Sequence, residues 1–128
     1  MNVLLDTHVL IWWSISPSNL SENVYKLLDN QVNNLFFSLA SIWEMQIKLQ
    51  IGKLSLNLPL PELIEDQRQT NGLQLLSIET SHIYALNNLP SHHKDPFDRI
   101  LIAQAMVEQM PVVSIDEVFD NYPIKRLW

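Results

Sequence analysis

Cysteine is absent from this 128-residue sequence, glycine occurs only twice, and no long apolar run is present. Without cysteine, the chain has no disulfide, no thiolate zinc site and no cysteine nucleophile. Two glycines, Gly52 and Gly72, are too few for a fold built on glycine-rich phosphate loops. No stretch approaches the roughly 18 apolar residues of a membrane span, and the first residues lack the positive region of a targeting segment. We therefore expect a cytoplasmic protein that does not enter a membrane.

Basic residues are also scarce: eight Lys and Arg stand against 14 Asp and Glu, giving a formal net charge of −6. Proteins that bind nucleic acids usually present a basic face. However, if four carboxylates shared one metal site, the rest of the chain would carry only −2, so the charge does not exclude a nucleic acid. The length, with 47% hydrophobic and 17% charged residues, predicts one folded domain over residues 1–128.

Four short apolar runs are the candidate strands: residues 3–5, 35–38, 73–78 and 112–115. Runs that are apolar throughout suit strands of a parallel sheet, which is covered on both faces. The tail, residues 124–128, is interpreted as a last edge strand or a packing tail.

Helical patterns separate these runs. Asn19 and Glu22 form a possible capping box for a helix whose apolar face contains Leu20, Val24, Leu27 and Leu28. Further helices are expected over residues 41–51, ending at Gly52, and over 61–70 and 80–88. Asp95 and Pro96 open another, which continues to about Gln109. Alternating strands and helices predict a three-layer α/β/α sandwich around a mainly parallel sheet of four to five strands.

Four acidic residues are placed to meet at one edge of this sheet. Asp6 directly follows the first strand and Asp116 the last, and ligands of parallel α/β sheets bind beyond the carboxyl ends of the strands. Glu44 lies early in the helix after the second strand, and Asp98 in the first turn of the helix opened by Asp95. Carboxylates gathered among apolar neighbours repel one another, and a hard divalent cation such as Mg²⁺ or Mn²⁺ would neutralise them.

Each acid also has a purely structural interpretation. Glu44 could complete a capping box with Ser41 or pair with Lys48 one turn later. Asp98 could reach back to the cap residue Asp95 or pair with Arg99, and Asp116 could simply start a turn.

Residues 4–8, 41–48, 95–105 and 114–116, in that order, resemble the motifs of PIN-domain ribonucleases, and most closely those of VapC-type toxins. The resemblance covers nearly the whole chain. It implies an acidic quartet of Asp6, Glu44, Asp98 and Asp116, with Asp95, Ser114 and Thr7 as auxiliary residues. Asp6 and Asp98 are the first choices as direct metal ligands. The family further implies Mg²⁺- or Mn²⁺-dependent cleavage of RNA, a homodimer, and inhibition by a partner antitoxin.

Other side chains are assigned from their surroundings. His8 is expected to line the cleft beside Asp6, whereas His92 and His93, in a polar loop, are expected to be exposed. The positive side chains near the acids, Lys48, Lys53, Lys94 and Arg99, are possible RNA phosphate contacts or a solvated rim. Three tryptophans at helical positions, Trp12, Trp13 and Trp43, are predicted to be core or interface. The dimer is expected to use Trp12, Trp13 and the helix that follows Asn19.

Two other functions remain open. One is a Mg²⁺-dependent phosphohydrolase with an aspartate nucleophile after the first strand. That chemistry usually needs a second aspartate two residues later, where this chain has His8. The other is a non-catalytic module of the same fold that binds RNA or a protein, for which a missing quartet acid would be the simplest sign. None of the four is missing.

Overall fold

The computed structural model describes residues 1–128 and contains a five-stranded sheet in the order β3-β2-β1-β4-β5. Its strands are β1 (Asn2–Leu5), β2 (Asn34–Ser38), β3 (Gln74–Leu76), β4 (Val112–Val113) and β5 (Arg126–Leu127). Every neighbouring pair is parallel, with Leu4 of β1 between Phe36 of β2 and Val112 of β4. The predicted parallel sheet is confirmed, and the tail of the chain is indeed an edge strand.

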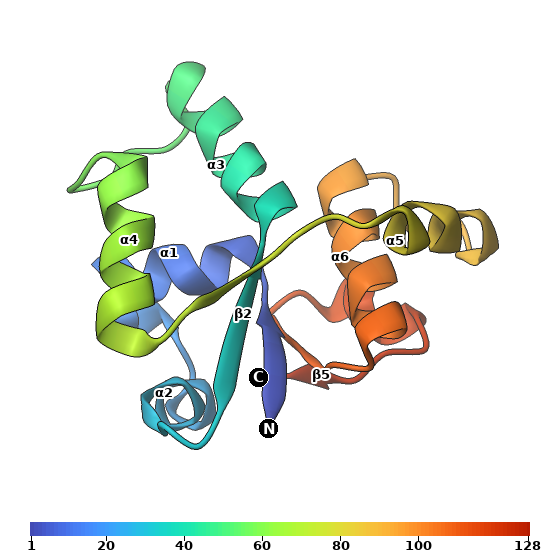
Figure 1. Ribbon diagram of the computed structural model, residues 1–128, viewed down its shortest axis with the longest axis horizontal. Coiled ribbons are helices and arrows are strands. Elements are labelled where there is room, and N and C mark those ends of the chain that lie inside the picture. The colour runs from blue at the N-terminus through green and yellow to red at the C-terminus, as the bar shows by residue number, and fades with distance from the viewer.

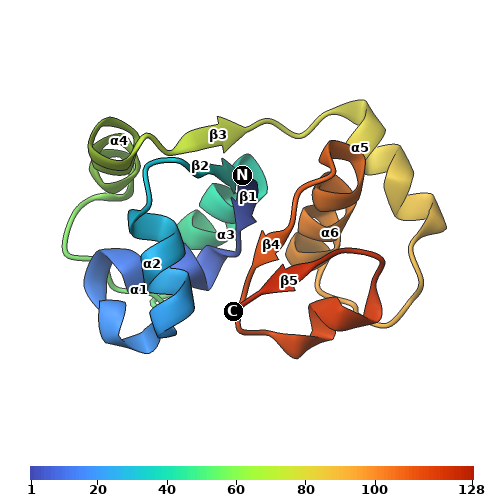
Figure 2. The same ribbon diagram turned by 90° about the horizontal axis from the view of Figure 1, so that it is seen from below.

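Helices cover both faces of the sheet, as the views in Figures 1 and 2 show. They are α1 (Thr7–Ile15), α2 (Glu22–Asp29), α3 (Leu39–Gln50), α4 (Leu60–Asn71), α5 (Thr80–Ala85) and α6 (Pro96–Glu108). Three short 3₁₀ segments add η1 (Pro17–Asn19), η2 (Leu86–Asn88) and η3 (Glu117–Asn121). None of the helices is long and apolar enough to span a membrane.

The two faces of β1 separate the core into layers, because successive side chains of a strand point to opposite faces. Val3 and Leu5 pack with buried residues of α1, α2 and α4 on one face. Leu4, between them, packs against Leu101 and Ala105 of α6 on the other. All three β1 side chains are fully buried, so the expected three-layer α/β/α sandwich is confirmed.

Two predicted helix starts are wrong by two residues, because a nearby serine provides the cap. Helix α2 is capped by Ser21, whose hydroxyl accepts from the Val24 amide, and not by Asn19, which lies in η1. Ser38, at the end of β2, caps α3, so that helix begins before Ser41.

Helix α1 was not among the helices whose bounds the sequence indicated. It begins immediately after β1, with the Asp6 carboxylate as its N-cap, and it is apolar around most of its circumference. An even distribution of apolar side chains gives no helical periodicity to detect. The helix ends at Gly52 and Gly72 are as expected, because both glycines adopt the positive φ angles that favour glycine after a helix.

Candidate active site

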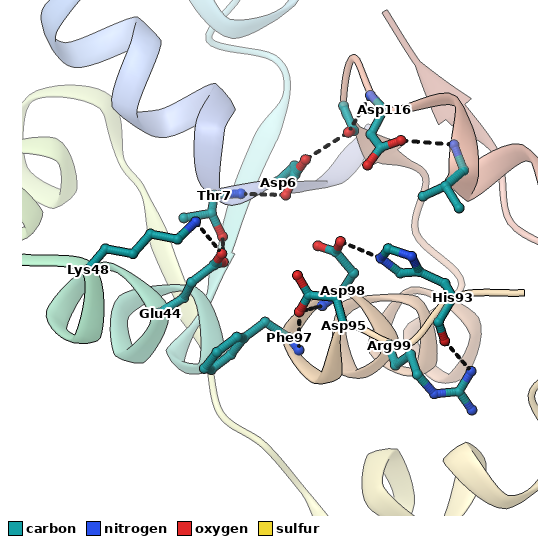
Figure 3. A network of polar contacts seen from close by, with 12 residues as sticks. Asp6, Thr7, Glu44, Lys48, His93, Asp95, Phe97, Asp98, Arg99 and Asp116 are labelled. Atoms are coloured by element: carbon teal, nitrogen blue, oxygen red, sulfur yellow. Dashed lines mark hydrogen bonds and ion pairs between the residues drawn. The ribbon is translucent and has the colours of Figure 1, made fainter. Parts of the chain in front are cut away.

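The carboxyl end of the sheet bears a cleft of about 510 Å³ in which the four quartet acids come together. Each belongs to a different part of the fold: Asp6 joins β1 to α1, Glu44 lies in α3, Asp98 in the first turn of α6, and Asp116 caps η3. Figure 3 shows their side chains around a common space. The lining residues are Asp6, His8, Trp12, Glu44, Lys48, His93, Asp95, Asp98, Ile115 and Asp116.

Asp6 is the most firmly held of these acids. Its Oδ1 accepts from the Thr7 amide at 2.8 Å, and its Oδ2 accepts from the buried Ser114 hydroxyl at 2.7 Å. The Asp6 side chain is buried, and burial raises its pKa. The two hydrogen bonds lower that pKa in turn, and the negative charge of Glu44 raises it further. Ser114 also accepts from the Asp116 amide at 3.0 Å, so one hydroxyl links the acids that follow β1 and β4.

Glu44 is oriented by a neighbour on each oxygen. The Thr7 hydroxyl donates to Oε1 at 2.8 Å, and Lys48 forms an ion pair with Oε2 at 2.8 Å (Figure 3). The predicted pair with Lys48 is therefore present, but the capping box with Ser41 is not. The Ser41 hydroxyl instead lies 2.9 Å from that of Thr7. Thr7 thus fixes two quartet acids, Asp6 through its amide and Glu44 through its hydroxyl.

Asp98 faces the cleft from the N-terminus of α6. Asp95 is the N-cap, as predicted, and accepts from the Phe97 amide at 2.9 Å. Burial raises the pKa of Asp98 to about 6. The negative charges of Asp6 and Asp95 also raise it, whereas a hydrogen bond from His93 lowers it. A carboxylic acid whose pKa is raised above its ordinary value, at the mouth of a cleft, is typical of a functional site.

The predicted pair between Asp98 and Arg99 is wrong, and the loop before α6 explains why. Asp98 Oδ2 lies 2.6 Å from His93 Nε2. Arg99 turns away from the carboxylates and donates to the backbone oxygens of Pro90 at 3.0 Å and His93 at 3.3 Å. Arg99 Nη1 thereby holds the loop. A contact of Arg99 with RNA phosphate stays a prediction.

His93 is the site residue that the sequence did not reveal. A polar loop containing two adjacent histidines indicated exposure for both, which holds for His92 but not for the half-buried His93. The only local signal was its place two residues before the helix cap Asp95. Its contact with Asp98 depends on how the loop folds back over α6, and sequence spacing does not give that.

The donor set suits a hard divalent cation. Ligand atoms of His93, Asp95 and Asp98 lie within 4.8 Å of one another. The buried Asp6 faces the same cleft, and the remaining quartet acids contribute further carboxylates. Mg²⁺ and Mn²⁺ prefer carboxylate oxygens, and a cation would offset the burial and repulsion that raise the pKa values of Asp6 and Asp98.

The three tryptophans, predicted to be core or interface, differ in burial. Trp12 and Trp13 are partly buried against the core of α1, α2 and α4, and the ring of Trp12 contacts that of Trp128. Trp43, by contrast, is 61% exposed and packs edge-on against Phe97. A core position is therefore wrong for Trp43, and an interface remains.

The sequence comparison decides the family. The family model for the PIN domain matches residues 3–125. The chain belongs to the PIN domain family. A comparison with curated proteins found no match in sequence.

Solved structures share this PIN fold over nearly the whole chain, although their sequences have diverged. A chain of the VapBC2 complex from Rickettsia felis, bound to a DNA fragment from its promoter, is 14% identical with a TM-score of 0.75. The match covers 99% of this chain and 98% of that chain, and coverage is given in the same order below. One from FitAcB of Neisseria gonorrhoeae is 18% identical, with a TM-score of 0.67 and coverage of 98% and 96%. One from a toxin–antitoxin complex of Klebsiella pneumoniae is 15% identical, with a TM-score of 0.55 and coverage of 90% and 87%.

Proposed function

We propose that this chain, as a single PIN domain over residues 1–128, is a divalent-metal-dependent ribonuclease that hydrolyses RNA phosphodiesters in the cytoplasm. The observation that carries the proposal is the convergence of Asp6, Glu44, Asp98 and Asp116 on one cleft. Isolated capping acids would not need to face one another. The raised pKa values of Asp6 and Asp98 favour a cation between them over four independent caps.

The chain's own residues prepare the site before any substrate arrives. Asp6 and Asp98 would hold the cation, with Glu44 and Asp116 as further ligands or as acceptors for the attacking water. A bound Mg²⁺ or Mn²⁺ would activate a water molecule and stabilise the charge that develops on the phosphate. Hydrogen bonds from Thr7, Ser114 and His93 keep the carboxylates in place, and a fixed arrangement reduces the reorganisation needed in the transition state.

We further propose that the chain is the toxin of a toxin–antitoxin pair and is inhibited by a cognate antitoxin protein. Support comes from the full-length similarity to chains from VapBC, FitAcB and toxin–antitoxin complexes. An open cleft that cleaves RNA needs a partner to close it during growth.

A homodimer is the oligomer that the surface supports best. Trp43, Ile78 and Ile83 are exposed, and they line an apolar hollow of about 250 Å³ between α3, α5 and α6. Contiguous exposed apolar surface marks an interaction site, and a twofold dimer would cover the same patch on both copies. We place the dimer face here and not at Trp12 and Trp13, which are half-buried within the fold.

The decisive experiment is cleavage by purified protein free of antitoxin. Structured and single-stranded RNAs would be incubated with Mg²⁺, Mn²⁺ or EDTA. Metal-dependent cutting that EDTA abolishes supports the proposal. RNA binding without cutting would favour the non-catalytic module, and release of phosphate from a phosphomonoester without RNA cleavage would favour the phosphohydrolase.

A further inference from the structure

Three of the five lysines of this acidic chain line one groove beside the acidic cleft. They are Lys48, Lys53 and Lys94, and the groove, of about 540 Å³, lies between the second half of α3 and the start of α6. With only eight basic residues in the chain and a net charge of −6, an even distribution would not place three in one hollow.

The groove adjoins the cleft. Both hollows are lined by Glu44, Lys48 and Asp95. The wall that they share therefore contains the Glu44–Lys48 ion pair and the N-cap of α6. A chain molecule with its reactive bond at Asp98 would pass along this wall as it leaves the cleft.

Two of the three lysines have no acidic partner. Lys48 is paired with Glu44, but Lys53 and Lys94 are exposed and form no ion pair. Lys26, outside the groove, is by contrast paired with Glu22. The positive charges of Lys53 and Lys94 are therefore available to an anionic ligand.

Local structure places these two lysines. Gly52, with a φ of 73°, lets the chain turn at the end of α3, and the Lys53 amide then donates to the Lys48 carbonyl at 2.8 Å. Lys94 directly precedes Asp95, the cap of α6, where the positive end of the helix dipole adds to its charge. The two lysines thus line the groove from just beyond the end of α3 and from just before the start of α6.

We propose that this lysine groove binds the sugar–phosphate backbone of single-stranded RNA next to the bond that is cleaved, with Lys53 and Lys94 as phosphate contacts. The inference rests on the proposed ribonuclease function. RNA is favoured over an acidic segment of a protein because the groove adjoins the cleft that would hold a phosphodiester, with Glu44, Lys48 and Asp95 lining both.

The test is steady-state cleavage of an oligouridine long enough to span cleft and groove, with Mg²⁺ and KCl from about 50 to 200 mM. We expect the double variant Lys53→Ala, Lys94→Ala to raise KM about tenfold and to leave kcat within twofold. Because each lost phosphate contact on a single strand lowers the salt slope by about 0.7, the slope of log kcat/KM should fall by about 1.4. Cleavage of a dinucleotide, too short to reach the groove, should be unchanged.

The matched control is Lys26→Ala, Lys125→Ala, which removes the same charge at two exposed positions outside the groove. A similar loss in this control, or an unchanged KM and slope in the groove variant, would overturn the groove while leaving the ribonuclease intact. Absence of cleavage by the wild-type protein, on this oligouridine and on the structured and single-stranded RNAs above, would instead refute the proposed function. If the wild-type protein does not cleave RNA, the binding of labelled oligouridine in EDTA tests the groove alone. Equal affinities of the wild type and the groove variant would then refute the RNA-binding groove as well.

Discussion

His93 Nε2 lies 2.6 Å from Asp98 Oδ2, and the backbone oxygen of His93 is held by Arg99, the residue that follows Asp98. Two consecutive residues of α6 therefore contact His93. Asp98 contacts the histidine ring, and Arg99 contacts the histidine backbone oxygen. The arrangement orients a carboxylate that would otherwise rotate freely at the mouth of the cleft. A partner that orients a metal-binding carboxylate contributes to metal affinity even where it is not itself a ligand.

Replacing this histidine tests whether it positions Asp98. We expect His93→Ala to lower the affinity for Mn²⁺ about tenfold, because the carboxylate loses its orienting partner. Calorimetric titration of the antitoxin-free protein with Mn²⁺ measures this. The adjacent His92→Ala is the control, since the His92 ring contacts Tyr122 and does not line the cleft. Equal Mn²⁺ affinities for the two variants would contradict the role.

Asp98→Asn separates catalysis from folding. The Asp98 backbone and its cap remain, so the fold should be kept, while RNA cleavage falls by several orders of magnitude. Asp6→Asn should abolish cleavage as well and cost about 1–2 kcal/mol of stability, because each Asp6 oxygen accepts a hydrogen bond and asparagine can accept only one of the two.

Two further variants serve as controls for this pair. Asp95→Asn should cost less activity than Asp98→Asn, because asparagine caps a helix nearly as well as aspartate. Asp66→Asn, on the surface of α4, should leave cleavage unchanged. Undiminished cleavage by folded Asp98→Asn would overturn the assignment of this acid.

Ser114→Ala removes the hydroxyl that joins Asp6 to the Asp116 amide. Asp6 loses a buried hydrogen bond and the Asp116 amide a partly buried one, so we expect a loss of about 1–3 kcal/mol in stability and a clear fall in cleavage. Chemical denaturation and an RNA cleavage assay measure the two effects. Ser114→Thr keeps the hydroxyl and should retain more activity than the alanine variant. Equal activities of the two variants would show that the hydroxyl is not what matters.

The raised pKa of Asp98 predicts a pH dependence of stability. With a pKa of about 6 in the folded chain against an ordinary value of 3.8, the folded form binds the proton more tightly. The metal-free protein should therefore lose stability as pH rises from about 4 to 6 and stay less stable above it. Asp98→Asn lacks this effect, so its Tm advantage over wild type should be absent near pH 4 and reach several degrees at pH 7.5.

Calorimetry in EDTA across this pH range provides the measurement, and a Tm difference that does not change with pH would contradict the cause. Adding Mg²⁺ or Mn²⁺ at pH 7.5 should raise the Tm of the wild type, because the ion binds only the folded form. The increase should be much smaller for Asp98→Asn.

The proposed dimer face gives a prediction that is independent of the acids. Trp43→Glu places a charge in the exposed apolar patch, and we expect it to convert a dimer into a monomer without unfolding. Light scattering at micromolar concentration distinguishes the two. Tyr25→Glu, at an exposed position on α2, is the control and should remain a dimer. A monomeric wild type would refute the dimer itself.

The sequence by itself determined the fold class and the edge at which the acids lie. Short apolar runs at residues 3–5 and 112–115 predicted buried parallel strands, and parallel strands share one carboxyl edge, so Asp6 and Asp116 were expected at the same edge. In the structure β1 and β4 are also neighbouring strands. Asp95 as a helix cap followed from residue type and the proline after it. These are local rules of backbone geometry, and they need no knowledge of packing.

Only the tertiary structure decided which side chains meet. The bonds from Thr7 to Glu44 and from Ser114 to Asp6 join residues 37 and 108 positions apart, and no local pattern encodes such pairs. The turn of the loop toward Asp98 moved His93 from the expected surface into the cleft. The exposure of Trp43 likewise depends on how α5 and α6 pack beside α3. Burial follows from this packing and cannot be predicted from the residue type alone.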